Sequence, residues 1–151
     1  MKIENRFVVP ASRDRVWRFI QSAEEVGACV PGCESVDVVS EGRFRARVRV
    51  KIGPIKALFN VDIERLEEQP LESATYATRG EEGGRASRLN ARSRLTLRAI
   101  DREQTELSYA SEISIAGRLG RFGAGVMKKK ADDLGGQFAA AVCERLAEIP
   151  A

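Results

Sequence analysis

Residues 118–149 read RLGRFGAGVMKKKADDLGGQFAAAVCERLAEI, and this stretch predicts one long helix. At 100° per residue, its large apolar side chains collect on one stripe that runs from Leu119 through Met127 to Phe138. Such a stripe is typical of a helix that buries one face. At about 1.5 Å per residue the helix would be roughly 45 Å long. We therefore expect the rest of the chain to form the surface on which it packs.

Small and polar residues interrupt the predicted helix. Its glycines, each of which costs about 0.5–1 kcal/mol in a helix interior, are Gly123, Gly125, Gly135 and Gly136. Lys130 and Gln137 also fall on the apolar stripe. These residues suggest a cavity beside the helix. Alternatively, Lys130 extends to the rim and the glycines only allow close packing, and the sequence leaves both interpretations open.

A strict alternation of apolar and basic residues over 43–52 predicts a β-strand, since no helix has that period. Gly53-Pro54 makes a turn, and the alternation resumes over 55–63. Pairing Ile52 with Ile55 would fix the register of this hairpin. On the outer face, the register predicts Arg43 opposite Glu64 and Arg45 opposite Asp62, and it leaves Arg47, Arg49 and Lys51 without an acidic partner across the hairpin.

A second hairpin is predicted from residues 88–100 and 104–116. Pairing Ile100 with Gln104 places Leu97 opposite Leu107 on the inner face. It also places Ser93 opposite Ser111 on that face. Buried hydroxyl groups are expected to have partners, so these serines form either a satisfied contact with each other or a polar patch in a cavity.

The remaining elements complete an α+β order without a parallel crossover. We expect a strand over 2–9, a short helix after Ser12, a second over 22–28, and strands over 35–40 and 73–79. A sheet of seven antiparallel strands would curl around the C-terminal helix. Residues 1–151 are expected to form one domain.

This order resembles the helix-grip fold of START-related (SRPBCC) lipid-transfer domains and of the birch-pollen allergen family over the whole chain. Five motifs resemble the family of the carbon monoxide dehydrogenase G subunit more specifically: VPGCE at 30–34, GRF at 42–44, VKIGPIK at 50–56, AGRLG at 116–120 and QF at 137–138. The resemblance implies an accessory protein that assists maturation or membrane recruitment of a molybdenum hydroxylase. It also implies that the fold binds apolar ligands. Some relatives continue into a hydrophobic tail, and because this chain ends at Ala151 we expect no built-in anchor.

Composition excludes several other functions. A net charge of +3 and few aromatic residues do not favour nucleic-acid binding. No apolar run is long enough to span a membrane, and residues 1–10 lack the apolar core of a signal peptide. We therefore expect a cytoplasmic protein, with peripheral contact at the inner face of the membrane as an option.

The residues of common active sites are missing. The chain has no histidine and no Gly-x-Ser-x-Gly motif, and the glycine run over 117–125 does not match a phosphate-binding loop. Cys29, Cys33 and Cys143 are expected to be free thiols rather than metal ligands, although a transient disulfide between Cys29 and Cys33 remains a minority interpretation. We predict no catalytic residue, cofactor or metal.

The resulting functional hypothesis is a carrier of a lipid- or quinone-like molecule. A quinone is suggested because an oxidase complex that delivers electrons to a membrane needs an apolar acceptor. The predicted cavity residues are Phe59, Ser93, Leu95, Tyr109, Ser111, Phe122, Gly123, Val126, Lys130, Leu134 and Gln137. The predicted docking residues, for an acidic partner or a membrane, are Arg47, Arg49, Lys51, Lys128 and Lys129. The alternative is a cyclase/aromatase-type or hydrolytic enzyme that uses the same cavity, with Lys130 as its best candidate group.

Overall fold

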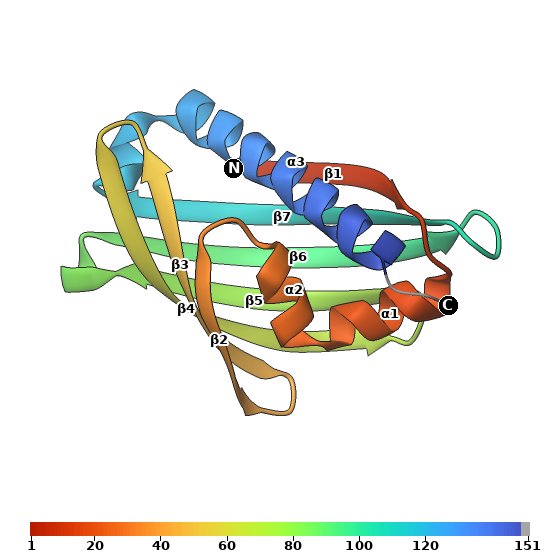
Figure 1. The fold of residues 1–151 in the computed structure, drawn as a ribbon. Helices are drawn as coiled ribbons and strands as arrows, with labels where there is room; N and C mark the ends of the chain where they lie inside the picture. The colour runs from red at the N-terminus through yellow and green to blue at the C-terminus, as the bar shows by residue number, and fades with distance from the viewer. Residues whose placement is uncertain (149–151) are drawn as a thin grey trace.

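The computed structural model describes residues 1–148 as a curved sheet with three α-helices (Figure 1). The first half contains β1 (Lys2–Val9), α1 (Arg13–Gln21), α2 (Ala23–Cys29), β2 (Cys33–Ser40), β3 (Arg43–Ile52) and β4 (Ile55–Gln69). The second half contains β5 (Ser73–Glu82), the short 3₁₀ helix η1 (Gly83–Arg85), β6 (Ser87–Ala99), β7 (Thr105–Gly117), the 3₁₀ helix η2 (Leu119–Phe122) and α3 (Ala124–Glu148).

The seven strands form one antiparallel sheet in the order β1-β7-β6-β5-β4-β3-β2. All three helices lie on one side of this sheet, and α3 crosses it diagonally (Figure 1). The predicted α+β helix-grip architecture, with a curved antiparallel sheet around a long C-terminal helix, is confirmed.

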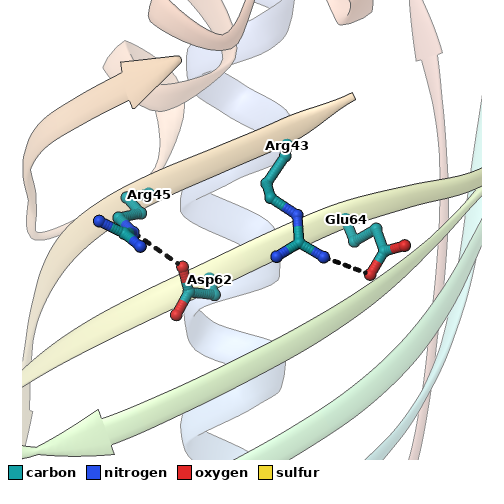
Figure 2. Close-up of polar contacts among 4 residues, drawn as sticks. All are labelled: Arg43, Arg45, Asp62 and Glu64. Atoms are coloured by element: carbon teal, nitrogen blue, oxygen red, sulfur yellow. Dashed lines mark hydrogen bonds and ion pairs between the residues drawn. The ribbon is translucent and has the colours of Figure 1, made fainter. Parts of the chain in front are cut away.

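Both predicted hairpin registers are confirmed. Ile52 pairs with Ile55 in the first hairpin, and Ser93 pairs with Ser111 in the second. The outer face of the first hairpin carries the two predicted ion pairs, which Figure 2 shows side by side: Arg43–Glu64 at 3.0 Å and Arg45–Asp62 at 3.1 Å. The alternation of side chains across a strand is therefore enough to define the inner and outer faces of the sheet.

Two strands are longer than predicted. β4 continues to Gln69, beyond the alternation seen over 55–63, and β5 continues to Glu82, beyond the strand predicted over 73–79. The register of β4 against β5 shifts between Arg65 and Glu67. This irregularity lets the polar end of β4 stay paired with β5. Pairing with a neighbouring strand therefore extends segments whose sequences alone favour loops.

The C-terminal helix differs most from its prediction, because α3 begins at Ala124 rather than at residue 118. Gly123 has a φ of +85°, a left-handed conformation that an α-helix cannot continue through. The residues before it form η2 instead, so a single helical phase does not connect them to α3. Met127, Gly135, Val142 and Leu146 form the buried face, whereas Gln137, which was expected on that face, is exposed. The predicted helix end, Ile149, lies outside the described residues.

The core is divided into two clusters. The first joins the C-terminal half of α3 to α1 and to the sheet, through residues such as Val16, Phe19, Leu107, Val142 and Leu146. The second lies where the β3–β4 turn meets η2 and the first turn of α3, and it consists of Ile52, Ala57, Phe59, Leu119 and Met127. The helix is therefore packed at both ends, and the space under its N-terminal half is bordered by the second cluster.

Candidate ligand-binding site

A cavity of about 720 Å³ lies between the start of α3 and strands β5, β6 and β7. The side chains that face it from the sheet include Thr78, Ala91, Ile113 and Ile115. From the helical side it is lined by Gly120, Gly123, Ala124 and Met127. The volume falls in the range of about 300–1,000 Å³ that is typical of small-molecule sites.

Small residues on opposite walls explain why this space is not filled. On the sheet, the small residues Thr78 and Ala91 stand opposite each other on β5 and β6, beside Ile113 on β7. Opposite them, the chain has glycine or alanine at Gly120, Gly123 and Ala124. A core at normal packing density would carry larger side chains on at least one of these walls.

The inner wall of the cavity is mainly apolar, but it includes Met1, whose N-terminal ammonium donates to the Ile113 carbonyl at 2.8 Å. Arg79, Arg92 and Glu112 also line the cavity, but they are exposed, and the alternation of the strands directs their side chains to the outer face. On the inner face of β4, the Arg65 guanidinium is paired with the Glu68 carboxylate at 2.8 Å. The site therefore suits a largely apolar molecule.

An ion pair between Arg118 and the buried Glu82 anchors the segment that leads into η2. The Glu82 side chain is 6% exposed and accepts two hydrogen bonds from the Arg118 guanidinium, one of them from Nε at 2.9 Å. The hydrogen bonds from Arg118, together with one from Ser87, lower the pKa of Glu82 despite its burial. The Leu119 amide in turn donates to Ser87 Oγ at 3.1 Å. These contacts fix η2, and with it Gly120, against the ends of β5 and β6.

Polar contacts hold the middle of α3 against the sheet. The Asn5 amide donates to Tyr109 Oη at 3.3 Å and to the Gly135 carbonyl at 3.5 Å. The Tyr109 and Phe138 rings meet edge to face, with their centroids 6.4 Å apart. Nearby, Ser93 and Ser111 form a hydrogen bond of 2.7 Å. Of the two interpretations of the serine pair, the structure thus shows the satisfied contact.

The predicted cavity residues are distributed over several environments. Gly123 lines the main cavity, Ser93 and Ser111 line a smaller hollow of about 340 Å³, and Tyr109 lines a third of about 440 Å³. Phe59 belongs to the second core cluster, which Phe122 packs against, and Leu95 packs against the first. Lys130 and Leu134 are half-buried, Gln137 is exposed, and Val126 is 48% exposed.

The sequence contained a signal for further lining residues. Ala91 is a small residue at an inward position of a clear strand, where a filled core would carry a larger side chain, and this supports the prediction of a cavity. Once the register of the second hairpin is known, Ile113 and Ile115 follow from the same alternation. Gly120 and Ala124 carry no comparable signal, because their position depends on the break at Gly123.

The predicted docking residues are all exposed. Arg49 nevertheless has a partner, since β2 brings Glu34 within 2.8 Å of it. Lys51 faces Lys56 directly across the hairpin. Within residues 1–148, no ion pair is formed by Arg47, Lys51, Lys128 or Lys129.

The three cysteines are free thiols. Cys29 is buried, and Cys33 and Cys143 are half-buried. Burial raises the pKa of all three thiols, which favours the protonated and less reactive form. Nothing in their surroundings points to a nucleophile.

The curved sheet, the long C-terminal helix and the cavity between them define a START-like helix-grip protein. A START superfamily protein from Mycobacterium smegmatis has the same fold, with 12% identity, a TM-score of 0.74 and coverage of 99% of each chain. More specifically, the chain belongs to the family of the carbon monoxide dehydrogenase G subunit (CoxG), which matches residues 6–147. The resemblance noted in the sequence is thereby confirmed.

Other solved structures share the fold at low identity. A conserved protein from Geobacillus kaustophilus has 20% identity and a TM-score of 0.90, with coverage of 98% of this chain and 96% of that chain. The Zhui aromatase/cyclase from Streptomyces sp. R1128 has 15% identity and a TM-score of 0.72, with coverage of 97% and 93%. No curated protein sequence matches the chain significantly.

In the part of the chain that the structure describes, no helix combines the length and the hydropathy that a membrane span requires.

Proposed function

We propose that this protein is a non-catalytic accessory protein that carries an apolar, lipid- or quinone-like molecule in the cavity under α3. The observation that carries the proposal is the space of about 720 Å³ between strands β5–β7, with the small residues Thr78 and Ala91, and the glycine-rich segment at the start of α3. Contact with the apolar part of this wall removes an apolar molecule from water, at roughly 25 cal/mol per Å² of buried surface.

The lining also supports binding rather than turnover. General acid–base catalysis needs a titratable side chain within hydrogen-bond reach of the substrate. Among the described lining residues, the titratable side chains are on Arg79, Arg92 and Glu112, and these point away from the cavity. The N-terminal ammonium of Met1 also lies at the cavity, where it donates to the Ile113 carbonyl. Lys130, the candidate group of the enzyme alternative, does not line it.

The family supplies the context of this carrier. Membership in the CoxG family supports association with a carbon monoxide dehydrogenase. We infer that the carrier assists maturation or membrane recruitment of such a molybdenum hydroxylase. A quinone in the cavity would connect the carrier role with the assistance to the enzyme, since a quinone is both apolar and an electron acceptor.

Filling the cavity tests this proposal. Ala91→Phe places a ring in the space between β6 and α3, and we expect it to weaken binding of a soluble naphthoquinone about tenfold or more, because the ligand and the new side chain need the same volume. Ala116→Phe is the matched control, since Ala116 is exposed on the outer face of the next strand. The measurement is a fluorescence-quenching titration, with circular dichroism to confirm folding. Equal affinities for a folded Ala91→Phe variant and the wild type would show that the cavity is not the binding site.

A cyclase/aromatase-type or hydrolytic activity is the second candidate, supported by the fold shared with the Zhui aromatase/cyclase. The two functions differ in the fate of the ligand. A carrier returns a bound molecule unchanged, whereas an enzyme accumulates product over many turnovers. Mass spectrometry of the ligand after prolonged incubation with catalytic amounts of protein distinguishes them.

A further inference from the structure

The sheet ends in two edge strands, β1 and β2, and their surroundings differ. β1 is in contact with α3, where the Cys143 thiol donates to the Val8 carbonyl at 3.2 Å and the Asn5 amide donates to the Gly135 carbonyl. β2 pairs with β3 on one side and ends the sheet on the other. Figure 1 shows that the hairpin formed by β2 and β3 extends past α1 and α2. We call the side of β2 that faces away from β3 the free edge.

The free edge presents backbone groups that lack a partner in the chain. In an antiparallel sheet, an edge strand directs alternate N–H and C=O groups away from its neighbour. Over residues 34–40, no backbone hydrogen bond to another backbone group within the described residues 1–148 is formed outside the pairing with β3. The Cys33 thiol lies 3.6 Å from the Ser35 carbonyl. The remaining groups are available to another strand, which would pair with several of them at once.

Exposed valines lie along the free edge, and little protects it. Val38 is 64% exposed and Val39 is 46% exposed. Proteins usually protect an edge strand with Lys, Pro, a bulge or a covering element. β2 reads CESVDVVS and contains no Lys, Arg or Pro. Its register shifts lie near its two ends, so residues 35–38 remain a regular strand.

The charges beside the free edge favour a second copy of the chain over a charged partner. Glu34 is bound to Arg49 at 2.8 Å, and Asp37 stands opposite Arg45 in the sheet. The edge is therefore close to neutral, although each chain has a formal net charge of +3. A strongly acidic or basic partner gains little at such an edge. A second copy offers the same valines and the same unpaired backbone groups.

The alternation of faces limits how two copies can pair. A two-fold axis perpendicular to the sheet keeps both inner faces on one side, so residues of the same face must stand opposite each other. A pairing centred on Asp37 would oppose two carboxylates, which is destabilising. A pairing centred on Val36 gains little, because Val36 already packs closely beside Gly27 of α2. A pairing centred on Val38 buries the exposed valine against its own copy and opposes no like charges.

We propose that two copies of this chain associate through β2, in antiparallel pairing, with Val38 of one copy opposite Val38 of the other. The two sheets then form one continuous sheet, and the helices of both copies lie on the same side of it. The cavity is lined by residues of β5, β6, β7 and the start of α3. These elements are distant from β2 in the strand order, so the association does not depend on the proposed function.

Sedimentation equilibrium at several protein concentrations tests the association. We expect the wild type to form a dimer that dissociates on dilution, and we expect added salt not to dissociate it, since no ion pair holds the contact. Val38→Lys places two like charges opposite each other at the centre of the pairing, so it should weaken association at least about tenfold. Val8→Lys is the matched control, because Val8 is an exposed valine on the edge strand that contacts α3. Circular dichroism confirms that both variants are folded.

Disulfide crosslinking tests the register. Residues directly opposite each other in an antiparallel pair have Cα atoms about 4.5–5.5 Å apart, within reach of a disulfide. Val38→Cys should therefore give a covalent dimer under mild oxidation. Ser40→Cys, at an exposed position of the same strand, should not, because it stands opposite Val36 of the other copy. The wild type, with its three native cysteines, gives the background.

Three results would overturn the proposal. The first is a wild type that remains monomeric at every concentration. The second is a folded Val38→Lys variant that associates as strongly as the wild type. The third is equal crosslinking at positions 38 and 40. Naphthoquinone binding by the Val38→Lys monomer should equal that of the wild type, so a failure of the dimer leaves the carrier proposal standing.

Discussion

At Gly135 the helix backbone lies directly against a tyrosine hydroxyl. A Cβ at this position would stand 2.6 Å from Tyr109 Oη and 3.4 Å from the Asn5 amide nitrogen. The glycine therefore permits a close approach that no other residue allows without movement of the tyrosine or of α3. Its neighbour Gly136 has no atom within 4 Å of the same position.

We predict opposite effects for alanine at these two glycines. Gly136→Ala should stabilise the protein by about 0.5–1 kcal/mol through helix propensity. Gly135→Ala should destabilise it by about 1–2 kcal/mol, because overpacking outweighs that gain. Urea denaturation gives both values. Adding Tyr109→Phe, which removes the hydroxyl oxygen, should recover part of the Gly135→Ala loss, and a purely additive double variant would contradict this account.

The environment of Glu82 also leads to a prediction, which concerns the pH dependence of stability. Arg118→Met leaves the buried Glu82 carboxylate without its charged partner, and we expect the variant to be less stable than the wild type at pH 7. Because its folded-state pKa is lowered, the stabilisation from Glu82 is present above the unfolded value of about 4.3 and is lost as the pH falls through the folded-state pKa. The stability difference between wild type and variant should therefore shrink below about pH 4.

A double variant checks the cause of this pH dependence. Glu82→Gln/Arg118→Met removes both charges, so no unpaired carboxylate is left in the protein. The difference in stability between this double variant and the wild type should therefore not include the cost of an unpaired carboxylate. Denaturation series at several pH values measure it. A gap between Arg118→Met and wild type that stays constant down to acid pH would show that Glu82 does not titrate in the way described.

At the scale of the element, α3 has two unequal halves. Its C-terminal half contributes Val142 and Leu146 to the first core cluster, at 0% and 3% exposure. In its first turns only Met127 is buried, and residues 124–126 are exposed. The half that covers the cavity is thus the less strongly held one.

We expect hydrogen exchange to report this difference. Amides over residues 137–147 should exchange more slowly than those over 126–131, because the latter can open without disrupting the first core cluster. Leu146→Ala should cost about 2–4 kcal/mol, while Val126→Ala should stay within about 0.5 kcal/mol. Exchange followed by mass spectrometry measures the first effect and denaturation the second. Uniform protection along α3 would contradict the division into halves.

The same elements show what could be predicted from sequence. Strand alternation gave both hairpin registers, because a shift of one residue would turn every side chain to the wrong face. The start of α3 could not be obtained in this way, since a single backbone conformation at Gly123 changes the phase of everything after it. The Arg49–Glu34 pair was missed because it depends on the pairing of β2 with β3, which carries a register shift between Cys33 and Ser35.

At the scale of the molecule, the residues that contribute most to the core and the residues that line the cavity lie in different regions. The first core cluster joins α1, the sheet and the end of α3, while the cavity borders the smaller cluster at the opposite end. The cavity costs the protein buried contacts that a filled core would have. A ligand that occupies it restores such contacts, so binding and stability should be coupled.

The last prediction concerns this coupling. A ligand that binds only the folded state adds about 2.7 kcal/mol of stability at a hundred times its Kd. With about 720 Å³ available, stabilisation should increase along a series of naphthoquinones with lengthening alkyl chains. It should level off when the chain fills the cavity, because further methylene groups then remain in water instead of contributing about 0.8 kcal/mol each. Thermal unfolding with each quinone at a fixed concentration measures the series. In Ala91→Phe the plateau should occur at a shorter chain, since the ring takes part of the volume, whereas a plateau at the same length in both proteins would place the binding site elsewhere.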